Sequence, residues 1–398
     1  MSYKLDLTNI DLEITTRCNL ACPYCYIGIA KLKEQKGCTG DMTDETIDDV
    51  LTMIEKHGHP RPTKRVTNGK TSYNRATHID FYGGEPLCAF PKVKHVIETA
   101  KKRGFQLTFA LLSNGTVGTK DQFDYLATNR CHIQRSIDGH REATEKYRPN
   151  SVDKYLEIRK VVRDFSDTRR MTIQPEFAKD ILKSMWWFEE VGYGKGISPM
   201  PNFYTEWSDE QIEDFKRSLW ALGSYYIRRW KQGDPFYVYY FARCIEARFG
   251  KPIGFGCGAG RGLHCVSWDG WIYACHRFSK EAHDSQFCYG TVKEALAGTA
   301  KGYGPDLVAR AQMGNNEGNW EPECRYCIAQ KACCKGCYHT NYVCNGCLNK
   351  PPKLFCVVRQ ETEKVIDHID DQLRRIDRRW YLRGNTCWLP KHTNCEHN

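Results

Sequence analysis

The stretch that decides the fold is LEITTRCNLACPYC, residues 12–25, in which a short β-rich run leads directly into three cysteines. The run Leu12–Thr16 predicts a strand, and Cys18, Cys22 and Cys25 follow it with the spacing C-x3-C-x2-C. Three thiolates this close together suit a soft metal site, either zinc or an iron–sulfur cluster. A four-iron cluster bound by only three protein ligands keeps one iron open for a substrate or cofactor.

A structural zinc would instead need a fourth Cys or His ligand. Residues 26–37 contain neither residue type, so that ligand would have to be Cys38 or a more distant side chain. The spacing alone leaves both metals open.

Around this loop, the first half of the chain alternates β-rich runs with helical stretches. The predicted strands are Leu12–Thr16, His78–Tyr82, Gln106–Leu112, His132–Ile137, Met171–Pro175 and Gly196–Phe203. The predicted helices cover residues 44–56, 91–103, 119–128, 152–166, 178–191, 208–231 and 357–380. Six strands alternating with helices favour a parallel sheet with right-handed crossovers. The active site then belongs at the C-terminal ends of the strands, where the loops converge.

Cysteine usage bounds the setting in which the protein works. The chain has 398 residues and 21 cysteines, and its first residues lack the basic and apolar segments of a signal peptide. No run approaches the roughly 18 apolar residues of a membrane span. We therefore expect a cytoplasmic protein without membrane contact, in which closely spaced cysteines hold metal or do chemistry and do not form disulfides.

The net charge is +10, from 58 Lys and Arg against 48 Asp and Glu. Such a balance favours acidic partners, and much of the excess lies in residues 57–78, which contain no acidic residue. Pro60, Pro62 and Asn68-Gly69 predict a loop there. This loop is either a solvated connection or a docking segment for an acidic substrate.

Three further motifs follow the next three predicted strands: Gly83-Gly84-Glu85-Pro86, the LLSNGT segment with Ser113 and Asn114, and the SIDG segment that begins at Ser136. Together with the cysteine loop they resemble the radical S-adenosylmethionine superfamily over residues 10–205. The resemblance implies an α/β fold, a partial (β/α)6 TIM-like barrel in residues 1–235. It also implies a [4Fe-4S] cluster on Cys18, Cys22 and Cys25, whose open iron chelates S-adenosylmethionine.

The same resemblance assigns the remaining cofactor contacts. Tyr24 would lie against the adenine, and Ser113, Asn114, Ser136 and Arg148 would contact the methionine carboxylate or the ribose. The GGEP strand end, Gly83 to Pro86, would let backbone carbonyls approach the cofactor's ammonium group, because glycine has no side chain.

A second cysteine module follows, with 12 of the 21 cysteines between Cys257 and Cys356. Its spacing resembles the SPASM extension, a cysteine-rich domain that holds auxiliary iron–sulfur clusters, and we expect it over residues 236–356, with a C-terminal helix and tail at 357–398. The resemblance implies two auxiliary [4Fe-4S] clusters, one on Cys257, Cys265, Cys275 and Cys337 and the other on Cys324, Cys327, Cys333 and Cys356. Cys344 and Cys347 are extra, and either could replace Cys356; with Cys324 and Cys327 they also fit a zinc-ribbon spacing.

SPASM relatives modify peptides or proteins, so the resemblance implies an oxidoreductase that forms a crosslink, a thioether or a similar bond in a ribosomally made peptide. It would use S-adenosylmethionine, three clusters and an external electron donor of the flavodoxin or ferredoxin type. Because Cys18 lies so near the start, we expect no leader-binding domain before the barrel, and the basic loop and aromatic-rich residues 186–241 become candidate substrate contacts.

The alternative within the same class is an anaerobic sulfatase-maturing enzyme. In that branch an aspartate base follows the cysteine equivalent to Cys275, whereas here His276 takes its place and becomes the candidate catalytic base. The alternative from another class is a zinc-binding protein that associates with nucleic acid, which the GGEP, SNGT and SIDG motifs argue against.

Overall fold

The computed structural model describes residues 6–28, 40–67, 70–161, 167–192, 196–249, 258–300 and 322–381. The chain divides into two compact units. Unit 1 comprises Met1–Arg135, Glu145–Asp167 and Cys257–Gln312, and unit 2 comprises Ser136–Thr144, Thr168–Gly256 and Met313–Asn398. Among the described residues, no helix has both the length and the apolar character needed to cross a membrane.

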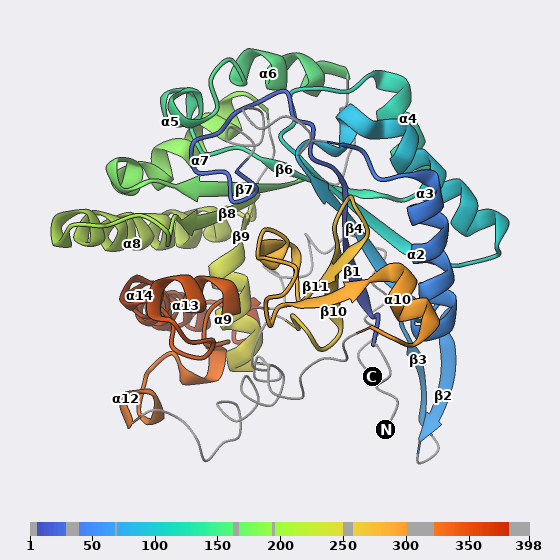
Figure 1. Cartoon of the computed structure of the whole chain (residues 1–398). Helices are drawn as coiled ribbons and strands as arrows, with labels where there is room; N and C mark the ends of the chain where they lie inside the picture. The colour runs from blue at the N-terminus through green and yellow to red at the C-terminus, as the bar shows by residue number, and fades with distance from the viewer. Residues whose placement is uncertain are drawn as a thin grey trace. The chain divides into compact units, whose positions relative to one another are not determined.

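Unit 1 is built on a sheet whose central strand is β1, Asn9–Thr15 (Figure 1). On one side, β1 pairs in parallel with β4 (His78–Gly83), which is followed by β5 (Thr108–Ser113) and β6 (His132–Ser136). The predicted parallel α/β sheet is thus confirmed, with strand ends within about two to three residues of the expected ones. All four strands end at the edge where the sequence motifs lie.

On its other side, β1 pairs in parallel with β10, Leu263–Val266, from the second cysteine module. β11 (Trp271–Tyr273) and β12 (Cys288–Thr291) continue the sheet as antiparallel strands. None of these three strands was expected from the sequence. The proposed domain limits at residues 235 and 356 stay predictions.

Both faces of β1 are buried. Ile10, Leu12 and Ile14 are fully buried on one face, while Asp11 and Glu13 are also nearly inaccessible on the other. Over the sheet, α2 (Asp44–His57) packs beside α3 (Phe90–Lys102) and α10 (Val292–Ala297) (Figure 1). The polar face of β1 is the one that carries groups capable of chemistry.

The basic segment 57–78 was predicted to be a loop, and this prediction is wrong. β2 (Thr63–Thr67) and β3 (Lys70–Asn74) pair in an antiparallel hairpin. The physical reason is that Asn-Gly, read as a loop signal, is also the preferred pair for a two-residue hairpin turn. Residues 68 and 69 themselves lie outside the described residues.

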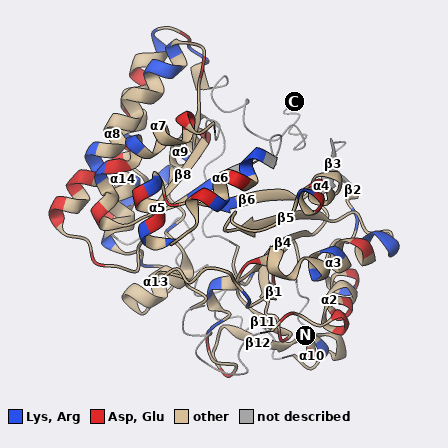
Figure 2. Ribbon diagram, turned by 90° about the horizontal axis from the view of Figure 1, so that it is seen from above, with Lys and Arg blue, Asp and Glu red and all other residues tan. Residues whose placement is uncertain are grey.

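Unit 2 contains the parallel strands β7 (Asp167–Ile173), β8 (Gly196–Pro201) and β9 (Tyr237–Val238). Its long helix α8, Asp209–Lys231, begins with the predicted capping box, in which Ser208 and Gln211 exchange hydrogen bonds. Its last helix α14 spans Lys353–Arg374 and packs on α8 and on α9, Tyr239–Phe249. Figure 2 shows acidic and basic residues spread along α8 and α14.

The predicted C-terminal helix is confirmed with shifted ends. Of its predicted apolar stripe, Val358, Val365, Ile369 and Leu373 are buried. The prediction that Ile376 is buried is wrong, because this residue lies beyond the last helical turn and is 56% exposed.

The remaining helices and turns are η1 (Pro86–Ala89), α4 (Lys120–Thr128), α5 (Arg141–Tyr147), α6 (Val152–Val161), η2 (Pro175–Asp180), α7 (Ile181–Glu190), η3 (His276–Phe278), α12 (Pro322–Arg325), η4 (Gln330–Ala332) and α13 (Tyr338–Asn345).

Candidate active site

The cysteine loop leaves the C-terminal end of β1, and its three thiols are half-buried neighbours. The backbone N–H of Cys25 donates to the carbonyl of Cys22 (3.0 Å), which forms a tight turn between the last two cysteines. Burial raises the pKa of the Cys18 thiol to about 12, and Cys22 and Cys25 act in the same direction. The N–H of Leu20 points at the Cys18 sulfur (3.4 Å), as a donor to a cluster-bound thiolate would.

Three clustered thiols with an N–H···S donor fit a [4Fe-4S] cluster that retains one open iron. In the described part of the chain, no group of three or more His, Cys, Asp or Glu side chains already stands close enough to hold a metal ion. The metal assignments therefore rest on the chemistry of the donor sets.

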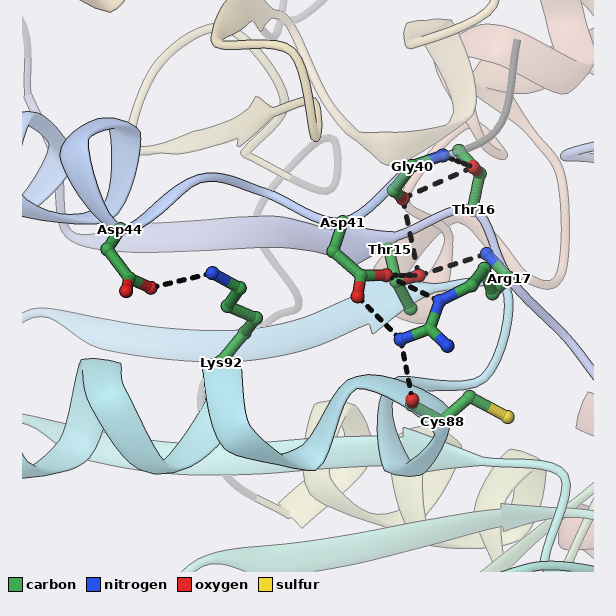
Figure 3. A network of polar contacts seen from close by, with 8 residues as sticks. All are labelled: Thr15, Thr16, Arg17, Gly40, Asp41, Asp44, Cys88 and Lys92. Carbon is green, nitrogen blue, oxygen red and sulfur yellow. Dashed lines mark hydrogen bonds and ion pairs between the residues drawn. The ribbon is translucent and has the colours of Figure 1, made fainter. Parts of the chain in front are cut away.

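Arg17 anchors the start of the cysteine loop (Figure 3). Its Nε and Nη2 donate to the two carboxylate oxygens of Asp41 (2.8 and 2.5 Å), and Nη2 also donates to the carbonyl of Cys88 (2.8 Å). Thr15 adds a hydroxyl bond to Asp41 (2.6 Å). Against the effect of burial, the bonds from Arg17 and Thr15 lower the pKa of Asp41, so the pair stays charged. The sequence analysis missed this pair, because only the fold brings Asp41 next to Arg17.

Gly83 and Gly84 lie where the end of β4 comes very close to the end of β1, and their contact with the cofactor stays a prediction. A Cβ on Gly83 would lie 2.1 Å from the Thr15 carbonyl oxygen, and one on Gly84 would lie 2.2 Å from that of Arg17. Gly84 donates to Thr15 (2.8 Å) and Glu85 donates to Arg17 (2.8 Å). The two glycines therefore let the end of β4 bond directly to the end of β1, at the base of the cysteine loop.

Glu85 is fully buried and ties β4 to β5. Its carboxylate accepts hydrogen bonds from the Leu87 N–H (3.2 Å), the Ser113 hydroxyl (3.0 Å) and the Asn114 N–H (2.6 Å). Burial raises its pKa from 4.5 to about 7, even though these donors oppose the shift. Pro86 begins η1 next to it and is also buried.

Asn114 connects the hydrogen bonds around Glu85 to the cysteine loop. Its side-chain amide donates to Asn19 (2.8 Å) and lies 3.7 Å from the Cys18 sulfur. Its own oxygen accepts from the hydroxyl of Thr116 (2.6 Å). The GGEP and SNGT motifs, which are separate in the sequence, thus form one hydrogen-bonded network next to Cys18.

Tyr24 and Arg148, two predicted cofactor contacts, are neighbours in unit 1. The Arg148 guanidinium carbon lies 5.5 Å from the centre of the Tyr24 ring, and Arg148 is 8% exposed. Its charge also acts on Glu85, where it lowers the pKa against burial. Ser136, the remaining predicted contact, ends β6 and belongs to unit 2.

His276 is held by Asp11 on the polar face of β1. Its Nδ1 lies 2.6 Å from a carboxylate oxygen of Asp11, and its backbone N–H lies 3.2 Å from the same oxygen. The ring stacks on Tyr82 at 4.2 Å and meets Tyr26 edge-on at 5.3 Å. An ionised carboxylate can only accept, so Nδ1 carries a proton, and in the neutral imidazole Nε2 keeps its lone pair.

A second polar pair lies along the same face, and only its carboxylate is buried. Lys280 donates to Glu13 (2.8 Å), a carboxylate that is 2% exposed and whose pKa is raised by burial. Cys265 and Cys275, two predicted ligands of the first auxiliary cluster, are buried close by: burial raises the pKa of Cys265, with contributions from Glu13 and Cys275. Acidic residues inside a buried strand were the signal that could have revealed this face.

The structure does not test the rest of that predicted ligand set. Cys257 lies outside the described residues, and Cys337 belongs to unit 2. The first auxiliary site stays a prediction.

The second predicted ligand set lies wholly in unit 2. Burial raises the pKa of Cys356 to about 11, and the thiols of Cys324 and Cys327 contribute to the shift. Burial likewise raises the pKa of Cys333 to about 12, with a contribution from Cys356. The alternative ligand Cys344 is exposed, and its thiol lies 3.5 Å from the carbonyl of Phe203. The arrangement favours Cys356 as the fourth ligand, and the full set stays a prediction.

Comparisons with known proteins agree on the class of domain. Residues 12–185 match the model of the radical SAM superfamily. The chain is 30% identical over 130 residues to an S-adenosylmethionine-dependent nucleotide dehydratase of Psychrobacter lutiphocae, covering 32% of this chain and 40% of that protein. It is 22% identical over 279 residues to a cysteine-type anaerobic sulfatase-maturating enzyme of Clostridium perfringens, covering 65% of this chain and 71% of that enzyme.

Two solved structures resemble the fold over most of the chain. The structure of anSMEcpe with bound AdoMet superposes with a TM-score of 0.71 at 15% identity, over 92% of this chain and 99% of that one. Streptococcus suis SuiB bound to its precursor peptide SuiA superposes with a TM-score of 0.53 at 11% identity, over 88% and 76%. At such low identity, these likenesses concern the fold alone.

Proposed function

The chain carries a radical SAM domain in residues 12–185, and from this premise we propose that it is an enzyme that oxidises a side chain of a peptide or protein. The observation that carries the proposal is the three-thiol loop at the C-terminal end of β1. Hydrogen bonds from Asn114 link this loop to the buried Glu85 carboxylate. This hydrogen-bonded network holds the cysteine loop at Cys18 before any cofactor binds, so that part of the site is preorganised.

When bound, the cluster and S-adenosylmethionine supply a 5′-deoxyadenosyl radical that takes a hydrogen atom from the substrate. In the proposed site, Cys18, Cys22 and Cys25 hold the cluster and Arg148 with Tyr24 bounds the cofactor. The buried polar face of β1 excludes bulk water from the reacting region.

The substrate radical must then lose one electron and one proton for the oxidation to be complete. In this proposal His276 accepts the proton at Nε2, and the hydrogen bond between its Nδ1 and Asp11 (2.6 Å) orients the ring. The predicted auxiliary-cluster cysteines would hold clusters with no open iron, and such clusters would suit acceptance of that electron. An external flavodoxin or ferredoxin would supply the electron that starts the cycle.

The substrate class rests on the fold. The structural neighbours include SuiB bound to a precursor peptide and anSMEcpe bound to AdoMet and the Cp18Cys peptide. The net charge of +10 favours an acidic peptide. We place the reaction in the cytoplasm, where the thiols stay reduced.

Sulfatase maturation is the second candidate, favoured by the TM-score of 0.71 with anSMEcpe and by the 22% identity to the Clostridium perfringens enzyme. The histidine at position 276 separates the two candidates, because the sulfatase-maturing branch uses an aspartate at the equivalent place. A chain that converts a cysteine peptide to its aldehyde would favour this second reading.

The test begins with anaerobic reconstitution of the full chain. We expect about twelve irons per chain, because three four-iron clusters are implied, and formation of 5′-deoxyadenosine from S-adenosylmethionine and dithionite. The Cys22→Ala chain is the matched control and should form no nucleoside. Zinc in place of iron, or a fully loaded sample that forms no 5′-deoxyadenosine, would refute the proposal.

The substrate is tested separately by co-expression with peptides encoded near the gene. Mass spectrometry then distinguishes a loss of two hydrogens, expected for a crosslink, from the exchange of a thiol for an aldehyde oxygen. Unchanged peptides alongside rapid nucleoside formation would exclude the tested sequences as substrates.

A further inference from the structure

Helix α14 presents three polar side chains to the cysteine loops of unit 2. Cys356, Arg359 and Gln360 are spaced i, i+3 and i+4, so they share one face of the helix. Arg359 Nη2 donates to the carbonyl of Ala332, the residue immediately before Cys333. The Gln360 amide lies 3.5 Å from the Cys327 sulfur. One helix face thus supplies a thiol, a cation and an amide donor to the same group of cysteines.

Arg359 is an unusual choice for this position, because it is only 5% exposed. Within the described residues, no carboxylate forms an ion pair with it. The nearest acidic residue along the helix, Glu363, is bound instead by Arg248 (3.2 Å), which also binds Asp367 (2.8 Å). A buried charge without a counter-ion is costly, and it persists where another negative group compensates for it.

Two buried neutral groups lie close to the guanidinium. Tyr240 and Cys244 are buried near it and interact with its charge, and burial raises the pKa of each to a value at which it stays neutral. The same charge acts on the thiols of Cys333 and Cys334. The compensating negative charge is therefore expected on the cysteine side of Arg359.

We infer that Arg359 raises the reduction potential of the auxiliary cluster held by Cys324, Cys327, Cys333 and Cys356. This inference rests on the proposed function, in which a cluster binds there. Reduction adds one negative charge to the cluster, and a fixed positive charge in a poorly solvated site stabilises the reduced form. Arg359 is therefore a tuning residue that makes this cluster a better acceptor of the substrate's electron.

The experiment is a redox titration of the reconstituted full chain, followed by electron paramagnetic resonance. A background with Cys18, Cys22 and Cys25 changed to Ala removes the catalytic cluster. The signal that disappears in the Cys356→Ala chain is then assigned to the α14 site. This readout does not depend on any peptide substrate.

Arg359→Gln should weaken reduction of this cluster at least tenfold, which corresponds to about 59 mV toward more negative potential for one electron. Arg359→Lys keeps the charge and should stay near the parent value. Arg375→Gln is the matched control: it removes the same charge from an exposed site about 24 Å along the helix axis, at 1.5 Å per residue, and should change nothing.

Glu363→Gln keeps the inference testable if Arg359→Gln fails to load iron. It removes a buried negative charge one turn away and should shift the potential in the opposite direction. If Arg359→Gln binds iron and its reduction potential is unchanged, the role of Arg359 is overturned. If Arg359→Gln does not bind iron, an unchanged reduction potential in iron-loaded Glu363→Gln overturns it. Either result leaves the proposed function intact. A parent chain that loads only the catalytic cluster overturns the auxiliary set itself, and with it the inference.

Discussion

Changing Gly84 to Ala separates two explanations of the GGEP motif. If the glycine only makes room for the cofactor, the substitution should leave the cofactor-free chain as stable as before. The structure predicts otherwise, because the new Cβ would lie 2.2 Å from the Arg17 carbonyl oxygen and 2.6 Å from its carbon. Backbone atoms cannot rotate away as a flexible side chain can, so the ends of β1 and β4 must separate.

The expected cost follows from the bonds at that junction. Separation would break the bonds from Gly84 to Thr15 and from Glu85 to Arg17, both 2.8 Å, each worth about 1 kcal/mol. Overpacking adds about 1–3 kcal/mol. We therefore expect a loss of roughly 3–5 kcal/mol, equivalent to a melting temperature lower by about 10 °C for a unit of this size.

The assay is thermal unfolding of the metal-free chain, monitored by circular dichroism. Gly262→Ala is the matched control in the same unit, because its Cβ would lie 3.6 Å from the nearest atom, the Thr8 Cβ, an ordinary contact. That chain should melt within a few degrees of the parent. A Gly84→Ala chain that melts at the same temperature as the parent would refute the steric argument. The remaining explanation would be that the glycine makes room for the cofactor.

Three further predictions concern the site. His276→Ala should lower the rate of peptide modification about 10²–10⁴-fold, because the proton acceptor is lost, and Asp11→Asn should lower it in the same direction. In both variants 5′-deoxyadenosine should still form. Equal losses of nucleoside and peptide product would contradict a proton-accepting role. Cys356→Ala should lose about four irons per chain, the content of one cluster, whereas Cys344→Ala should lose none, and iron analysis showing the reverse would exchange the two ligands. Because the pKa of Glu85 is raised from 4.5 to about 7, the folded chain keeps a proton that the unfolded chain releases. The free energy of unfolding should therefore fall by up to about 3 kcal/mol between pH 4.5 and 7, and urea titrations of Glu85→Gln should lack this component; equal pH slopes would argue against a buried neutral carboxyl.

The sequence predicted the parts of the fold that depend on neighbouring residues. The strands before Cys18, Gly83 and Ser113 follow from short β-rich runs, and the capping box at Ser208 marks the start of α8. The same local information misjudged the basic segment 57–78. An Asn-Gly pair is compatible with a loop and with a hairpin, and only the pairing of the flanking residues decides between them.

The sequence by itself also determined which reactive groups the site contains, because the thiol spacing and the glycine-rich strand end lie within single short segments. Only the tertiary structure decided what those residues contact. Asp11 meets His276 across 265 positions of sequence, and β10 joins β1 to extend the sheet. Arg359 reaches Ala332 only because α14 folds back over the cysteine loops of unit 2. The physical reason is that charge compensation and steric fit depend on distance in space, which local periodicity along the chain does not encode.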